Sequence, residues 1–179
     1  HELNPIGTVL AYDDAGRDKG NADKSAKDVE GYDADNQAMI AWIKKQPWFA
    51  GSIGAMGFCI GGHLAFRAAL QPEIEATACF YATDLHTHVI PNKPNQHSMD
   101  RLKDIKGELL MIWGKQDNHI PEQGRKAVYE KMVDAKLAFT WHEFNGQHAF
   151  MRDEGERYDP ELALLGYDLA LKLFQRKLA

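Results

Sequence analysis

The chain has few cysteines, no long apolar run and no surplus of positive charge, and each shortage excludes a class of protein. Two cysteines in 179 residues are too few for a disulfide framework, so we expect free thiols in a reducing compartment, the cytoplasm. No run approaches the roughly 18 apolar residues that span a bilayer, and the first residues lack the pattern of a signal peptide. A net charge of −5, with 21 dispersed Lys and Arg, provides no basic surface for DNA or RNA. We therefore expect neither a membrane nor a nucleic acid as a partner.

The apolar pattern that is present alternates between strand and helix. With 44% hydrophobic residues, a chain of this length buries one core, and we predict a single domain over residues 1–179. The patterns predict strands at 51–58, 74–82, 108–114 and 137–144, and helices at 32–46, 60–70 and 121–135. Leu162, Leu165, Leu169 and Leu173 form the stripe of a final helix, whereas 1–31 is interpreted as a polar surface segment. Strands separated by helices predict an α/β fold with a mainly parallel sheet.

The segment Gly57-Phe58-Cys59-Ile60-Gly61 lies between a predicted strand and a predicted helix. This is a nucleophile-elbow pattern, in which a sharp turn exposes a nucleophile and glycines two residues to either side prevent a collision. The helix amides after the turn would lower the pKa of the Cys59 thiol, and the Ile60 N–H would donate to an oxyanion. The alternatives are a phosphate-binding glycine loop or a buried structural cysteine.

Two further side chains follow later strands. Asp117 lies in the loop after strand 108–114, and His148 lies in the loop after strand 137–144. Taken singly, Asp117 could be a turn or cap residue and His148 an ordinary loop histidine. The order Cys59, Asp117, His148 is nevertheless the nucleophile, acid, histidine order of α/β-hydrolases, and each residue would stand at the carboxyl end of a strand. The three together predict a Cys-His-Asp triad.

The motifs "GFCIGG", "GKQDNHIP" and "GQHAF" together resemble the dienelactone hydrolase (carboxymethylenebutenolidase) family of the α/β-hydrolase superfamily. The resemblance implies a three-layer α/β/α sandwich, here a reduced fold with about four strands, because family members carry further strands before the equivalent of residue 1. It also implies that Cys59 is the nucleophile, His148 the base and Asp117 its partner, and that no cofactor is needed. Arg152 matches a family arginine that contacts a substrate carboxylate, although a surface ion pair with Asp153 or Glu154 is an alternative.

The predicted reaction is hydrolysis of a carboxylic ester or lactone through a thioester acyl-enzyme. Suitable substrates are short-chain or activated esters and anionic lactones. We expect Phe58 and His86 to line the substrate site. His86 and His88 alternate as metal ligands can, but no third ligand is evident, and we predict no metal.

A second class of function remains open. Without the front strands, the chain could be a catalytically weak remnant that serves as a small-molecule binding or interaction module. The missing strands would also leave strand 51–58 as an exposed edge, and such edges pair readily with other chains. We therefore expect a homo-oligomer, most simply a dimer formed through this edge.

Overall fold

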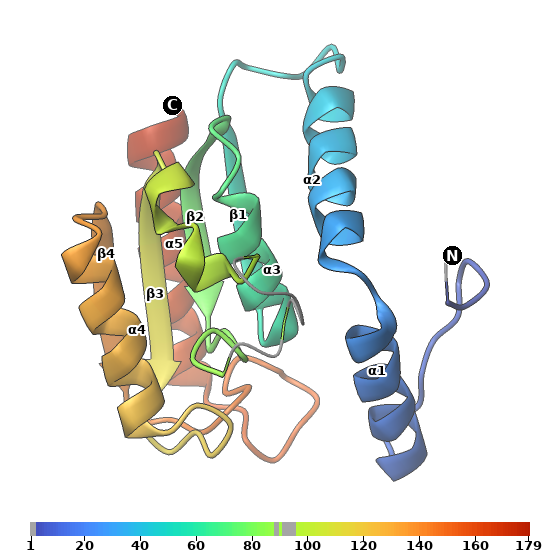
Figure 1. Ribbon diagram of the computed structural model, residues 1–179. Coiled ribbons are helices and arrows are strands. Elements are labelled where there is room, and N and C mark those ends of the chain that lie inside the picture. Colours follow the sequence, from blue (N-terminus) through green and yellow to red (C-terminus); the bar gives the residue numbers. More distant parts are fainter. Residues whose placement is uncertain (1–2, 88–89, 91–95) are drawn as a thin grey trace.

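Four parallel strands form one sheet, in the spatial order β1-β2-β3-β4 (Figure 1). The computed structural model describes residues 3–87, 90 and 96–179. The strands are β1 (Ile53–Phe58), β2 (Ile74–Phe80), β3 (Glu108–Gly114) and β4 (Phe139–Phe144). The helices are α1 (Asp14–Ala26), α2 (Val29–Ile43), α3 (Ile60–Ala68), α4 (Glu122–Asp134) and α5 (Pro160–Leu178), with 3-10 turns at Ser98–Asp100 and Leu102–Asp104. The predicted parallel sheet of about four strands is confirmed.

Helices cover both faces of the sheet, as the three-layer prediction requires. In Figure 1, α3 and α4 lie in front of the sheet and α5 lies behind it. Helix α3 packs against β1 and β2, and α5 packs against β1, β2 and β3. The two central strands, β2 and β3, are buried along nearly their whole length. Burial on both faces is why residues 109–114 of β3, "LLMIWG", are apolar throughout rather than alternating.

The N-terminal region differs from the sequence-based prediction. Within the segment interpreted as polar surface, residues 14–26 form α1, and the side chain of Asp13 caps it by accepting from the Gly16 N–H. None of the residues of α1 is buried. The helix therefore lacks the apolar periodicity on which helix prediction depends, and the sequence pattern does not indicate it.

Strand β1 lies at one end of the sheet order, as predicted for strand 51–58. Among the described residues no strand pairs with its outer side, and Met56 on this strand is 47% exposed. Pairing of another chain at this edge stays a prediction. No helix in the described part of the chain has the length and apolarity needed to cross a membrane.

Candidate active site

The turn between β1 and α3 holds Cys59 in an unusual backbone conformation. Its φ of 57° and ψ of −123° lie outside the regions that a residue with a Cβ prefers. Hydrogen bonds hold the turn from both sides. The Cys59 N–H donates to the Phe80 carbonyl at 3.0 Å, and the Cys59 carbonyl accepts from the Gly62 N–H at 3.0 Å. The thiol therefore stands at the carboxyl edge of the sheet, at the start of α3.

Gly57 is required by the tightness of this turn, but Gly61 is not. A Cβ on Gly57 would lie 1.9 Å from the carbonyl oxygen of Gly61, whereas a Cβ on Gly61 would meet no atom within 4 Å. The prediction that both glycines clear space is therefore wrong for Gly61. The second glycine that the packing requires is Gly62, where a Cβ would lie 2.8 Å from the Phe80 carbonyl oxygen.

The structure brings the three predicted triad residues together. The Nε2 atom of His148 lies 3.2 Å from the Sγ of Cys59, and Nδ1 lies 2.6 Å from Oδ2 of Asp117. The other carboxylate oxygen of Asp117 accepts from the His119 N–H at 2.8 Å. Both Asp117 and His148 are buried, which keeps this arrangement away from bulk water. Sulfur, imidazole and carboxylate thus form one continuous chain of contacts.

The electrostatic interactions among Cys59, His148 and Asp117 favour a thiolate and an imidazolium. Burial disfavours the charged form of His148, but the Asp117 hydrogen bond and the contact with Cys59 outweigh it and raise the pKa of His148 to about 9. Burial likewise opposes ionisation of Cys59, yet the hydrogen bond and charge of His148 leave the pKa of this thiol below its ordinary value. The two groups titrate as a coupled pair, in which each stabilises the charge of the other.

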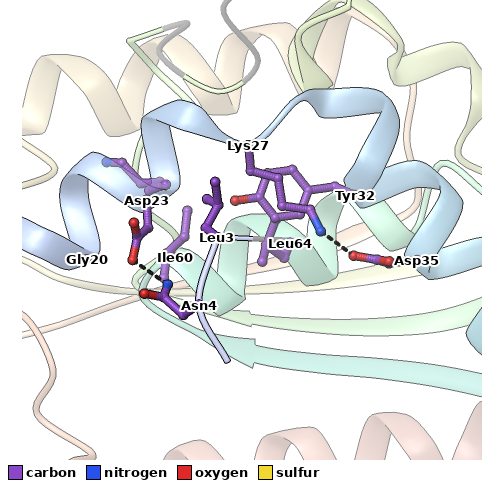
Figure 2. Close-up of a pocket in the computed structure, with 10 residues that line it drawn as sticks. Leu3, Asn4, Gly20, Asp23, Lys27, Tyr32, Asp35, Ile60 and Leu64 are labelled. Carbon is purple, nitrogen blue, oxygen red and sulfur yellow. Dashed lines mark hydrogen bonds and ion pairs between the residues drawn. The ribbon is translucent and has the colours of Figure 1, made fainter. Parts of the chain in front are cut away.

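The backbone amide of Ile60 favours the thiolate and helps to lower the pKa of Cys59. The side chain of Ile60 borders a cavity of about 470 Å³ between α1 and α3 (Figure 2). Leu64 also borders this cavity, and charged groups from the N-terminal helices complete it, among them Lys27, which is paired with Asp35. A small, partly polar space therefore adjoins the residue after the cysteine.

Of the predicted substrate-binding residues, Arg152 has the clearest position. Its guanidinium lies over the ring of Tyr12, 4.4 Å from the centroid. Among the described residues it forms no ion pair with Asp153 or Glu154, so the alternative interpretation as a surface ion pair is not supported.

The other two predicted lining residues pack into the fold. Phe58 stacks on Phe80 with centroids 4.8 Å apart and contacts Tyr167 of α5. His86 packs against α4, where a Cβ on Gly124 would lie 2.6 Å from its ring. Its Nδ1 is buried without a hydrogen-bond partner. Contact of either side chain with a substrate stays a prediction.

Three residues near the triad were not predicted from the sequence. The ring of His119 lies 4.5 Å from that of His148, and the ring of Tyr81 lies 5.2 Å from it. The Thr83 N–H donates to the Cys59 carbonyl at 3.3 Å. Of these, only His119 lies in one of the family motifs, "GKQDNHIP". Its position two residues after Asp117 is the sequence signal that could have placed it near the triad.

The described residues contain no group of three His, Cys, Asp or Glu side chains that could hold a metal ion. His88, one of the two alternating histidines, lies outside the described residues.

A parallel sheet with a strained cysteine turn after β1 and a histidine after β4 is the arrangement of an α/β-hydrolase. The model of the dienelactone hydrolase family matches residues 12–178, and the chain belongs to this family. It is 36% identical to a Saccharomyces cerevisiae protein named "Putative carboxymethylenebutenolidase", over 95% of this chain and 65% of the relative. It is 26% identical to the carboxymethylenebutenolidase of Pseudomonas putida, over 82% of this chain and 58% of that protein.

Among solved structures, the dienelactone hydrolase-like promiscuous phosphotriesterase P91 from metagenomic libraries is similar with a TM-score of 0.74. The match covers 98% of this chain and 72% of P91 at 20% identity, and it shows the shared fold. The chain spans less than two thirds of the length of both curated relatives named above.

Proposed function

We propose that this chain carries the catalytic machinery of a carboxylic ester hydrolase, with Cys59 as nucleophile, His148 as general base and acid, and Asp117 as the group that orients His148. The observation that carries the proposal is the continuous contact from Sγ through the imidazole to the carboxylate, at 3.2 and 2.6 Å. Membership of the dienelactone hydrolase family supports it.

The proposed reaction has two steps. In the first, the Cys59 proton resides on Nε2 of His148, and the thiolate attacks the carbonyl carbon of the ester or lactone. The negative charge that develops on the carbonyl oxygen is stabilised by the Ile60 N–H. The tetrahedral intermediate then collapses to a thioester, and the leaving alkoxide takes the proton from His148.

In the second step, His148 accepts a proton from a water molecule, and the resulting hydroxide attacks the thioester. Its collapse releases the carboxylic acid and restores the Cys59 thiolate with a protonated His148. Asp117 holds Nδ1 protonated throughout, so that Nε2 faces the sulfur and can accept and return the proton. The cysteine proton leaves with the alcohol and a proton from water replaces it on His148, so the cycle restores the starting protonation state.

Short-chain or activated esters and anionic lactones are the proposed substrates. The Ile60 amide is the one oxyanion donor assigned in this site. Removal of one such donor lowers the rate by about 100- to 1000-fold. Reactive esters have a lower barrier to begin with and are therefore the favoured substrates. Arg152 would attract a substrate carboxylate, consistent with the names of the two curated relatives.

Hydrolysis of p-nitrophenyl acetate by the parent chain and by Cys59→Ala tests the proposal. We expect the variant to lose the activity, because the other cysteine, Cys79, is buried within β2. Cys59→Ser should retain only a small part of it, because a hydroxyl needs stronger base assistance than a thiol. Equal rates for the parent and Cys59→Ala would leave the alternative, a binding or interaction module without catalysis.

We propose in addition that the chain is one cytoplasmic domain and that it self-associates through the exposed edge of β1. The free thiols and the position of β1 at the end of the sheet support these two proposals.

A further inference from the structure

The loop between β4 and α5 turns sharply directly after His148. The next residue, Ala149, has a φ of 62°, a left-handed conformation that residues with a Cβ adopt rarely. The Arg152 N–H donates to the Ala149 carbonyl at 3.0 Å and closes this turn. Farther along, the Asp159 N–H donates to the Phe150 carbonyl at 2.9 Å and closes the loop. The backbone of Arg152 is therefore fixed relative to His148.

The ring of Tyr81 connects this loop to the triad. Its centroid lies 5.2 Å from that of the His148 ring and 5.2 Å from that of the Phe150 ring. Burial and the charge of Cys59 raise the pKa of Tyr81, whereas the charge of Arg152 acts in the opposite direction. One phenol therefore lies within range of both the nucleophile and the guanidinium.

Arg152 differs from most arginines of the chain in its partners. Its guanidinium forms neither an ion pair nor a hydrogen bond with any described residue, although Asp153 and Glu154 follow it directly in the sequence. Arg157, in the same loop, likewise has no ion pair with a described residue. Every arginine outside this loop pairs with a carboxylate, namely Arg17, Arg67, Arg101, Arg125 and Arg176. The donors of Arg152 are thus available for an anion that comes from outside the chain.

Two separate segments hold the Arg152 guanidinium. The ring of Tyr12, from the segment before α1, lies beneath the guanidinium carbon, which is 4.4 Å from the ring centroid. Gly155 also lies against the guanidinium, because a Cβ there would lie 2.8 Å from Nη2 and 3.1 Å from Nε. An aromatic ring attracts the charge of an arginine but occupies none of its N–H donors in hydrogen bonds. An arginine held in this way can bind a carboxylate through two parallel hydrogen bonds.

We propose that Tyr12 is a positioning residue for substrate selectivity, which together with Gly155 holds Arg152 ready for a substrate carboxylate. The inference rests on the proposed function, in which Arg152 attracts that carboxylate. Tyr12 is 86% exposed, so its ring contributes little to the core. Without the ring, the arginine would be free to turn toward Asp153 or Glu154, and an anionic substrate would have to order it first. A neutral ester needs no contact with Arg152 and should be unaffected.

The test compares KM for two esters that share a leaving group and a chain length, p-nitrophenyl hexanoate and p-nitrophenyl hydrogen adipate. Only the adipate ester carries a carboxylate. Tyr12→Leu should raise KM for the adipate ester by about two- to fivefold, which is the contribution of an exposed contact between a cation and a ring. KM for the hexanoate ester should stay near the parent value. Tyr12→Phe, the matched control, keeps the ring and should keep the parent ratio of the two KM values.

Three variants of the loop extend the test. Arg152→Gln should raise KM for the adipate ester by at least about tenfold, because hydrogen bonds to a charged group are lost. Gly155→Ala should raise it in the same direction, since the added Cβ meets the end of a flexible side chain and displaces the guanidinium. Arg157→Gln removes an equal charge from the same loop and should leave both KM values near those of the parent.

A second measurement does not depend on hydrolysis. Adipate and its uncharged diamide, adipamide, are compared for their protection of Cys59 from alkylation by iodoacetamide, followed by mass spectrometry. We expect adipate to protect the parent chain at lower concentration than adipamide does. This advantage should shrink in Tyr12→Leu and disappear in Arg152→Gln.

The outcomes separate this inference from the proposed function. If Tyr12→Leu changes KM for both esters equally, or for neither, the inference is overturned even with Cys59-dependent hydrolysis intact. An equal effect of Arg157→Gln and Arg152→Gln also overturns it, because the charge of the loop rather than a held guanidinium would then select the substrate. If the parent chain hydrolyses no ester, protection by adipate that depends on Tyr12 still supports the inference, and only the proposed function is rejected.

Discussion

Replacement of Asp117 by Asn tests how the charge of the triad is maintained. The Asp117 hydrogen bond to Nδ1, at 2.6 Å, is the largest of the contacts that raise the pKa of His148 to about 9. The imidazolium is therefore present below about pH 9 and is lost as the pH rises through that value. An asparagine keeps the size of the side chain but removes its charge. It can also donate to Nδ1, which leaves the proton on Nε2 and prevents this nitrogen from accepting the cysteine proton.

A hydrogen bond between charged partners contributes about 1.5 to 3 kcal/mol. Its loss should reduce the stability of the imidazolium by about 10- to 150-fold, so the alkaline limb of kcat/KM should move to lower pH. We expect kcat/KM for p-nitrophenyl acetate at about pH 8 to fall by roughly the same factor. The measurement is a complete profile from acid to alkaline pH for the parent and Asp117→Asn, with folding checked by circular dichroism.

Asp84→Asn provides the matched control. Asp84 is a carboxylate near the site that pairs with Lys24, and its positive φ of 64° is a conformation that asparagine adopts readily. This variant should keep the position of the alkaline limb. If Asp117→Asn retains an alkaline limb near pH 9, Asp117 does not control the charge of His148 and the reasoning is refuted.

Two further predictions concern the turn and the sheet edge. Gly57→Ala should abolish soluble folded protein or activity, because its Cβ would lie 1.9 Å from a backbone oxygen. This collision should destabilise the fold by more than the roughly 3 kcal/mol of ordinary overpacking. Gly61→Ala, whose Cβ would meet no atom within 4 Å, should fold and remain active. Circular dichroism and esterase assays measure the folding and activity of both variants, and equal results for Gly57→Ala and Gly61→Ala would contradict the prediction. Sedimentation velocity should show a dimer that Met56→Lys weakens, because a charge on an edge strand opposes pairing. A single monomeric species at every concentration would reject the edge-pairing proposal.

The sequence predicted the sheet well because its central strands are buried on both faces. The apolar segments 74–82 and 108–114 contain β2 and β3, and their continuous burial leaves a pattern that neighbouring loops lack. The proximity of Cys59, Asp117 and His148 was also predictable, since the carboxyl ends of parallel strands meet at one edge. By contrast, α1 buries no residue and leaves no periodic signal.

Other features depend on contacts between segments that are distant in sequence. The Thr83 N–H donates to the Cys59 carbonyl because Phe58 pairs with Phe80 across β1 and β2, which brings the two strand ends together. Arg152 faces Tyr12, 140 positions earlier in the chain, rather than its acidic neighbours in sequence. The necessity of Gly62 rather than Gly61 likewise arises from the packing of α3 on the end of β2. No local pattern records such contacts.

The second cysteine gives the protein a built-in reference for chemical labelling. Cys79 is fully enclosed in β2, and burial raises the pKa of its thiol well above the ordinary value. An electrophilic dye should therefore attach to one sulfur per folded chain, with no need for a cysteine-free background. Uptake of a second dye molecule would then report unfolding, so one reagent can count intact sites and follow denaturation in the same sample.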